Sequence, residues 1–221
     1  MACTQAAQLL RESRSIIVIQ NGLAVLEDVP RLTAGRGCIG VASFGVTFTA
    51  PGKVRFLGRG SLMIGGGDAE TLAEMFHSAG IEAIPHQDIA REVWKKALIS
   101  SAINPLTALL GKKNGIVVED PWTRTLALSL YAEGAEAALA CAALDKVEVD
   151  AEAMISVAEM TRENTSSMLQ DISRGRKTEV DAINGALVRL GQQRGLNMPY
   201  NRAMCLLMHA VERQTQAPRK G

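Results

Sequence analysis

The sequence has little of what marks several classes of protein. Aromatic residues make up only 4% of its 221 residues, and the formal net charge is +1. A surface that stacks bases and attracts phosphates needs aromatic and basic groups together, so we expect no nucleic-acid partner. No run of about 18 apolar residues occurs, so we expect no membrane-spanning helix.

Metal-binding patterns are also absent from the sequence. The four cysteines form no CxxC pair, and the three histidines are scattered, so we expect no metal site. We interpret the cysteines as reduced thiols of a cytoplasmic protein. The first 14 residues contain no apolar segment of the kind that signal peptides have. The cysteines are Cys3, Cys38, Cys141 and Cys205.

The chain changes character near residue 88. Before this point short β-branched runs alternate with glycine-containing turns, which predicts an α/β domain over residues 1–87. After it, apolar residues recur every three to four positions, which predicts an all-helical domain over residues 88–221. Strands are predicted at 15–20, 38–48, 53–57 and 62–64, with helices at 4–13 and from a cap at Asp68 to about residue 78. Further helices are predicted at 88–111, 119–144, 150–169, 176–194 and 200–213.

One glycine motif resembles a dinucleotide-binding fingerprint. Residues 35–40 (GRGCIG) match G-x-G-x-x-G. The fingerprint requires a strand before the glycines and a helix after them, because the helix N-terminus binds the pyrophosphate. Here the residues before the motif are not strand-like, and the residues after it are strand-like and not helical. We therefore interpret the motif as a loop that enters a strand.

Four segments, in this order and spacing, are similar to ketopantoate reductases (2-dehydropantoate 2-reductases). Each segment is weak alone, but together they are specific, and they extend over essentially the whole chain. They are residues 19–23 (IQNGL), 92–96 (EVWKK) continuing through 103–108 (INPLTA), 164–172 (NTSSMLQDI) with 178–185 (TEVDAING), and 195–201 (GLNMPYN).

The resemblance implies a fold and a reaction. The fold is a partial Rossmann-type α/β domain followed by an all-α domain like that of 6-phosphogluconate dehydrogenase. The reaction is the NADPH-dependent reduction of ketopantoate, or a related 2-oxo acid, in pantothenate biosynthesis. The family begins with a strand–GxGxxG–helix unit that this sequence lacks. An inactive remnant, or a partner-binding protein without the cofactor cradle, is therefore the alternative.

Three polar residues are spaced to lie on one face of a helix. Lys96, Ser100 and Asn104 follow one another at intervals of four. Such a stripe suits either a ligand site or a solvated helix face. The resemblance favours the site: it implies that Lys96 is the catalytic acid and that Ser100 and Asn104 bind substrate. The family usually has asparagine where Ser100 stands, which leaves the identity of the substrate open.

The remaining site residues also come from the resemblance. It implies that Asn114 and Ser167 bind substrate, that Glu179 acts beside substrate and cofactor, and that Asn21 contacts the nicotinamide end of NADPH. The simpler alternatives are a turn at Asn114, a helix cap at Ser167, a surface carboxylate at Glu179 and an Asn-Gly turn at Asn21. If the site hypothesis holds, Lys96, Asn104, Ser167 and Glu179 converge on one cleft.

The expected partners follow from the same reasoning. The substrate is a small 2-oxo acid. A parallel sheet without its first strands exposes the edge of the strand at 15–20, and unpaired backbone groups at such an edge favour association. We therefore expect a homodimer, or a partner chain, that covers this edge.

Overall fold

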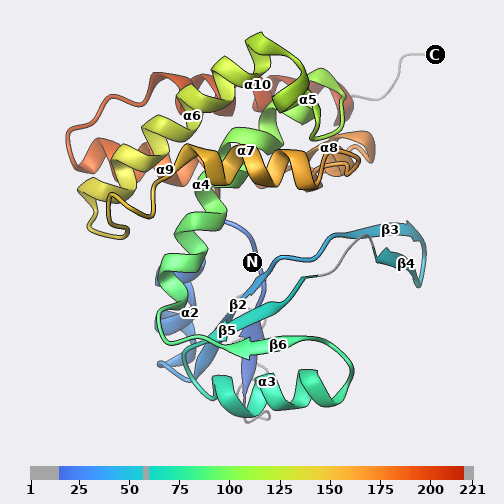
Figure 1. Ribbon diagram of the computed structural model, residues 1–221, viewed down its shortest axis with the longest axis vertical. Coiled ribbons are helices and arrows are strands. Elements are labelled where there is room, and N and C mark those ends of the chain that lie inside the picture. Colours follow the sequence, from blue (N-terminus) through green and yellow to red (C-terminus); the bar gives the residue numbers. More distant parts are fainter. Residues whose placement is uncertain (1–14, 57–59, 217–221) are drawn as a thin grey trace. The chain divides into compact units, whose positions relative to one another are not determined.

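The computed structural model describes residues 15–56 and 60–216 (Figure 1). The helix predicted at 4–13 lies outside the described residues. The chain divides into two compact units, Met1–Val93 and Trp94–Gly221, and we refer to them as the sheet unit and the helical unit. The division falls inside helix α4 (Ile89–Leu110).

The sheet unit is built on four strands in the order β1-β2-β5-β6. β1 pairs with β2 in parallel, β2 with β5 antiparallel, and β5 with β6 in parallel. Among the described residues β1 pairs with β2 alone, so the strand predicted at 15–20 stands at one end of the sheet. The strands are β1 (Ile16–Val18), β2 (Gly37–Ala42), β5 (Leu62–Gly65) and β6 (Ala83–Pro85).

Two helices pack on opposite faces of this sheet. Side chains alternate between the faces of a strand, and neighbouring residues of β2 contact different helices. Gly37 faces Thr33 of α2 (Val25–Thr33), whereas Cys38 belongs to a buried cluster with Ala73 of α3 (Ala69–Ser78). The sheet unit therefore has helix on both sides, as nucleotide-binding α/β domains do.

Three details of the sheet unit differ from the sequence predictions. The strand predicted at 38–48 is two strands in different sheets, because β2 ends at Ala42 and β3 (Val46–Ala50) pairs with β4 (Lys53–Phe56) as a separate hairpin. Helix α2 was not predicted, because Pro30 lies inside it and turn residues precede it. Asp68 occupies the N-cap position of α3, but its side chain makes no capping hydrogen bond.

The helical unit contains only helices and their connections among the described residues (Figure 1). α6 contacts α5, α7, α9 and α10, and α8 contacts α10. Gly134 of α6 lets two helices approach, because a methyl group there would lie 2.8 Å from Leu98 and 3.3 Å from Leu187. After α4 the helices are α5 (Ile116–Glu119), α6 (Pro121–Ala140), α7 (Ala151–Met160), α8 (Ser167–Ser173), α9 (Asn184–Gln193) and α10 (Pro199–Gln216).

Two predicted helices of this unit are shorter than expected. The helix predicted at 150–169 is broken, because α7 ends at Met160 and Ser166 caps a new helix, α8. The helix predicted at 176–194 begins only at Asn184, because residues 178–183 form a turn. α6 and α7 begin as their sequences suggest, with Asp120 and Asp150 as side-chain caps.

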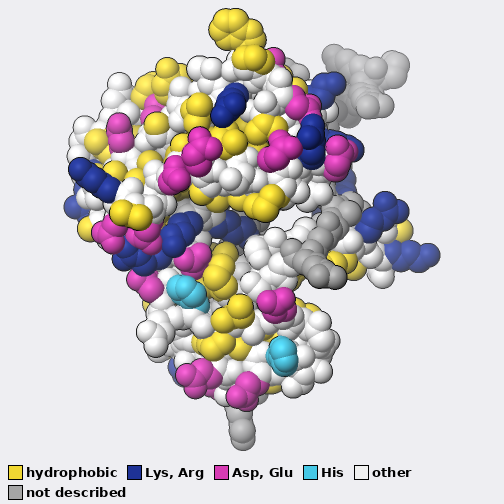
Figure 2. Space-filling model, viewed as in Figure 1, with side chains coloured by type: hydrophobic (Ala, Val, Ile, Leu, Met, Phe, Trp, Pro, Cys, Tyr) yellow, Lys and Arg dark blue, Asp and Glu magenta, His cyan; other side chains and the backbone are white. Residues whose placement is uncertain are grey.

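The surface of the helical unit carries charges of both signs. On the face seen in Figure 2, lysine and arginine side chains are interspersed with aspartate and glutamate. In the part of the chain that the structure describes, no helix is both long and apolar enough to span a membrane.

Candidate functional site

Helix α4 carries three of the residues predicted for the site. Lys96, Ser100 and Asn104 follow one another at one-turn intervals along it, and each is partly buried. The helix continues through Pro105 to Leu110. The predicted polar stripe is therefore a continuous face of one helix.

The environment of Lys96 disfavours its charge. Burial lowers the pKa of its ammonium group below the ordinary value, and the negative charge of Glu179 opposes this shift without cancelling it. Glu179 also acts on Asp171 of α8: burial is the main cause that raises the pKa of this carboxyl, and the charge of Glu179 adds to it. Lys96, Asp171 and Glu179, from three segments of the helical unit, thus lie within electrostatic range of one another.

The turn that carries Glu179 is held from both sides. The backbone N–H and the hydroxyl of Thr178 both donate to Glu212 of α10, at 2.7 and 2.6 Å. Val180 and Ile183 are fully buried in a cluster with residues of α4, α8 and α10. Glu179 lies between these anchors and is only partly buried. Its position is thus set by its neighbours in the chain.

The two serines of the SSM segment have different surroundings. The Ser166 hydroxyl caps α8 by accepting from the N–H of Leu169, and it accepts a 2.7 Å hydrogen bond from Thr107 of α4. Ser167 is exposed. Ser166, and not Ser167, therefore caps α8. The hydrogen bond from Thr107 attaches the start of α8 to α4, about one helical turn beyond Asn104.

Asn114 lies at the turn between α4 and α5 and is 9% exposed. Its side-chain amide donates to the Thr161 hydroxyl at 2.9 Å, and its backbone N–H donates to the carbonyl of Asn164 at 3.0 Å. Its Oδ1 atom has no hydrogen-bond partner among the described residues. These contacts attach the α4–α5 turn to the segment that precedes α8. Its predicted role in substrate binding stays a prediction.

Asn21 belongs to the sheet unit. It follows the carboxyl end of β1 and is partly buried, and Gly22 has a φ of 93°, which fits the Asn-Gly turn recognised in the sequence. Ligands of open α/β sheets bind outside the carboxyl ends of strands. Asn21 thus has a suitable location in its own unit for a cofactor contact.

The glycine motif at 35–40 is not arranged as a phosphate cradle. It connects helix α2 to strand β2, which is the reverse of the order that the fingerprint requires. A methyl group at Gly37 would lie 2.7 Å from Oγ1 of Thr33, so the absence of a side chain there serves helix packing. The interpretation of this motif as a loop entering a strand is confirmed.

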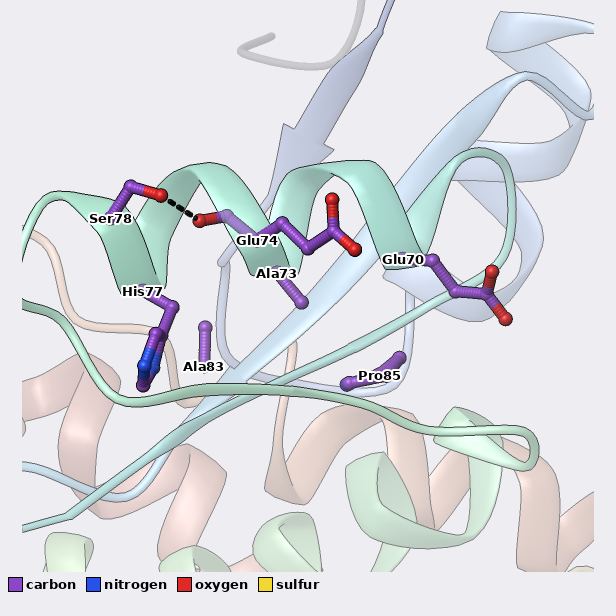
Figure 3. A pocket seen from close by; sticks show the side chains of 7 residues that line it. All are labelled: Glu70, Ala73, Glu74, His77, Ser78, Ala83 and Pro85. Atoms are coloured by element: carbon purple, nitrogen blue, oxygen red, sulfur yellow. Dashed lines mark hydrogen bonds between the residues drawn. The ribbon is translucent and has the colours of Figure 1, made fainter.

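A shallow hollow beside α3 and β6 is a separate feature of the sheet unit (Figure 3). It contains none of the predicted site residues. The hydroxyl of Ser78 donates to the backbone carbonyl of Glu74, as the dashed line shows. No group of three potential metal ligands occurs within residues 15–56 and 60–216. The lining residues are Glu70, Ala73, Glu74, His77, Ser78, Ala83 and Pro85.

The sequence did not assign roles to the residues that hold the site together. Thr178 was recognised as part of a segment, but its contact with Glu212, 34 residues away, has no local signal. Glu133 accepts from the N–H groups of Tyr200 and Asn201 at the start of α10, at 2.8 Å each, and these contacts likewise have no local signal in the sequence. A buried carboxylate at a helix N-terminus stabilises it, but the pairing requires the tertiary structure.

Comparisons with known proteins show which family the chain is similar to. The family model described as ketopantoate reductase PanE/ApbA C terminal matches residues 88–212, and the one described as ketopantoate reductase PanE/ApbA matches residues 1–69. The 2-dehydropantoate 2-reductase of Archaeoglobus fulgidus is 38% identical over 204 residues, which are 88% of this chain and 67% of the relative. That of Pyrococcus abyssi is 35% identical over 195 residues, 84% of this chain and 63% of the relative.

The chain belongs to the ketopantoate reductase family. It is by family an oxidoreductase, and the family predicted from the four sequence segments is confirmed. The crystal structure of a PanE/ApbA family ketopantoate reductase from Ralstonia eutropha matches 97% of this chain and 73% of its own, with a TM-score of 0.86 and 26% identity. The predicted fold class is likewise confirmed. The chain spans about two thirds of the length of the curated relatives it matches.

Proposed function

We propose that this chain provides the substrate-binding and proton-donating part of a 2-dehydropantoate 2-reductase, which reduces ketopantoate or a related 2-oxo acid to the 2-hydroxy acid. The observation that carries the proposal is the environment of Lys96. Its side chain is partly buried, the pKa of its ammonium group is lowered, and it lies on a helix face with Ser100 and Asn104 and within electrostatic range of Glu179. These are the requirements of a lysine that releases a proton near working pH.

Each residue of the proposed site has a separate role in the reaction. The nicotinamide cofactor, NADPH by the resemblance, supplies a hydride to the keto carbon when it is bound. Lys96 gives a proton to the keto oxygen. Asn104 and Ser100 hold polar groups of the substrate, and the exposed Ser167 hydroxyl binds its carboxylate.

Glu179 keeps the lysine charged until the proton leaves, because its negative charge stabilises the ammonium form. Asn114 contributes to the substrate side of the site, and Asn21 contacts the nicotinamide end of the cofactor from the carboxyl end of β1. Among the described residues β1 has a neighbouring strand on one side only, and an uncovered edge favours a second copy of the chain or a partner chain beside it.

The test measures NADPH oxidation with ketopantoate. Because the chain spans two thirds of its relatives, the assay is run on the chain alone and on the chain joined to the part of the A. fulgidus relative that this chain does not match. Lys96→Ala is expected to lower turnover by about 10²–10⁴-fold, the usual contribution of a general acid. Lys95→Ala is the matched control, since Lys95 pairs with Glu148 at 3.2 Å, and it retains turnover.

Ser100→Asn tests the substrate contact. It returns the amide that the family usually has, and it is expected to leave turnover with ketopantoate unchanged or to raise it. If the joined protein folds and binds NADPH but reduces no 2-oxo acid, the remnant alternative replaces the proposal. Full turnover in Lys96→Ala would show that the proton comes from another group.

A further inference from the structure

A buried chain of polar groups runs through the helical unit. The side-chain amide of Asn184 donates to the backbone carbonyl of Ser101 and to Oδ1 of Asn201, at 3.0 Å each. The amide of Asn201 donates to the carbonyl of Leu130 at 3.0 Å and to Glu133 at 2.9 Å. Asn184 and Asn201 are 0% exposed. This network joins α4, α6, α9 and α10.

The Ser101 carbonyl is available to Asn184 because of the sequence of α4. A carbonyl in a helix normally accepts from the N–H four residues later, and that residue is Pro105, which has no N–H. Asn184 donates to the carbonyl in place of the missing helix bond. A proline inside α4 thus creates an acceptor at a defined point on the helix.

This acceptor lies beside the proposed site in the sequence of α4. Ser101 follows Ser100 directly and is five residues from Lys96. Asn184 is the first residue of α9 and directly follows the turn that carries Glu179. The hydrogen bond from Asn184 to the Ser101 carbonyl therefore joins the segment that carries Glu179 to α4, the helix that carries Lys96.

We propose that Asn184 is a positioning residue that places Glu179 relative to Lys96. Its hydrogen bond to the Ser101 carbonyl, which Pro105 leaves without a helix donor, attaches the turn that carries Glu179 to α4. Asn201, itself bonded to Glu133, holds the Asn184 side chain in place. The inference rests on the proposed function, because the pair it positions is the proposed proton donor and its partner carboxylate. Asn184 does not touch the reacting atoms in this proposal, and it acts only through the turn.

The energetics of Asn184 support a positioning role over a purely stabilising one. Its Oδ1 atom is buried and has no hydrogen-bond partner among the described residues. A buried polar atom without a partner costs free energy, which offsets part of what the two hydrogen bonds donated by Asn184 contribute to stability. Buried polar groups of this kind are retained in some proteins because they fix the register between helices.

The test follows the ionisation of Lys96 by NMR in protein labelled with ¹³C-lysine, without substrate or cofactor. The Lys96 signal is assigned by its absence in Lys96→Arg. Glu179→Gln removes the charge that raises the Lys96 pKa, so it is expected to lower that pKa in the parent. In the Asn184→Leu background the same substitution is expected to produce less than about half of that shift, because the turn is no longer docked. An equal shift in both backgrounds would overturn the proposal.

A second pair of variants separates positioning from stability. Pro105→Ala returns an N–H to the Ser101 carbonyl, so in the Asn184→Leu background it is expected to recover thermal stability without recovering the shift. If the shift returns together with the stability, Asn184 is only a structural residue. Met154→Ala creates a cavity at a buried position of α7, a helix that contributes no residue to the network, and is expected to keep the full shift. A shift lost equally in this control would also overturn the proposal.

The outcomes distinguish this inference from the proposed function. If Glu179→Gln leaves the Lys96 pKa unchanged in the parent, the proposed acid pair itself is wrong, and the inference fails with it. If the parent shows the shift and Asn184→Leu preserves it, only the inference fails. Asn201→Ala removes one partner of Asn184 and gives the same comparison should Asn184→Leu not fold: a reduced shift supports the proposal and an undiminished one overturns it.

Discussion

The two units of the molecule fix the positions of their elements by different means. In the sheet unit the backbone does this: the ladder pairs Ile16 with Gly37 and Ile39 with Gly65. Thr33 is the one buried polar side chain within the described part of this unit. The helical unit buries many more among its described residues: Ser101, Thr107, Asn114, Thr123, Glu133, Ser166, Asn184, Asn201 and Glu212.

The difference follows from where backbone hydrogen bonds are made. Strands bond to one another, so their pairing sets a register. Helices satisfy their backbone groups internally, and packing of apolar ridges allows a range of crossing geometries. Buried polar contacts such as Thr107 to Ser166 and Asn184 to Ser101 add the missing positional information. Single polar side chains should therefore matter more in the helical unit.

The largest effect on stability is expected at Glu133. Its carboxylate accepts from two backbone N–H groups of α10 and from the side chain of Asn201. Hydrogen bonds to a charged group contribute about 1.5–3 kcal/mol each, although not additively. Glu133→Ala should therefore lower the free energy of unfolding by about 3 kcal/mol or more, measured by urea denaturation followed by circular dichroism.

The matched control for this prediction is Glu136→Ala. Glu136 lies on the same helix, is exposed, and should change stability by less than about 0.5 kcal/mol. If Glu133→Ala costs no more than the control, buried polar contacts do not hold the helical unit, and the comparison between the units fails.

The sheet unit should be most sensitive to volume. A methyl group at Gly37 would lie 2.8 Å from Cγ1 of Val29 and 2.7 Å from Oγ1 of Thr33. Gly37→Ala should therefore separate α2 from β2 and cost about 1–3 kcal/mol, the usual penalty of overpacking. The same denaturation experiment measures it. Gly52→Ala is not an equivalent control, because Gly52 has a positive φ and alanine there would also strain the backbone. Ala42→Gly, in the same strand as Gly37, tests loss of side-chain volume instead.

Gly37 also shows what the sequence could and could not predict about the fold. Periodicity predicted the strands and helices whose signals are local, such as β1, β5 and α4. It did not predict that 38–48 divides between two sheets or that the helix expected from residue 176 begins at Asn184, because these depend on which partner each residue meets. The glycine at position 37 is explained by packing against α2, which no local pattern contains.

The candidate site was predictable to a similar degree. The four-residue spacing of Lys96, Ser100 and Asn104 gave a shared helix face, and the family resemblance supplied Glu179. The free carbonyl before Pro105 was also foreseeable, since proline always removes a donor. Its partner was not: Asn184 lies 83 residues from Ser101, and its amide could have served any buried acceptor.

A smaller effect is expected at Thr33, a buried polar residue of the sheet unit. Its hydroxyl donates to the carbonyl of Val29 at 2.6 Å and accepts from the N–H of Gly37 at 2.8 Å. Thr33→Val keeps the shape and removes both bonds, at a cost of about 1 kcal/mol for neutral groups. A loss as large as that of Glu133→Ala, in the same denaturation assay, would contradict the contrast between the units.

The smallest effect, and one of opposite sign, is expected at Lys96. Burial lowers the pKa of this lysine in the folded protein below its ordinary value of 10.5. Below the folded pKa the lysine is charged in both states, so the folded protein bears the full cost of a buried charge. Between the two pKa values the unfolded state binds more protons, so stability of the parent rises with pH.

Lys96→Met removes this cost. The variant should be more stable than the parent at neutral pH, and its advantage should shrink as the pH rises through the folded pKa and past 10.5, above which the lysine is neutral in both states. Thermal unfolding from neutral to alkaline pH measures the trend, with Lys112→Met, at an exposed position, as the control that shows none. A Lys96→Met protein less stable than the parent at neutral pH would mean that the ammonium group is stabilised where it lies. The helical unit would then hold a favourable ion pair at its site, and not the strained lysine that proton transfer requires.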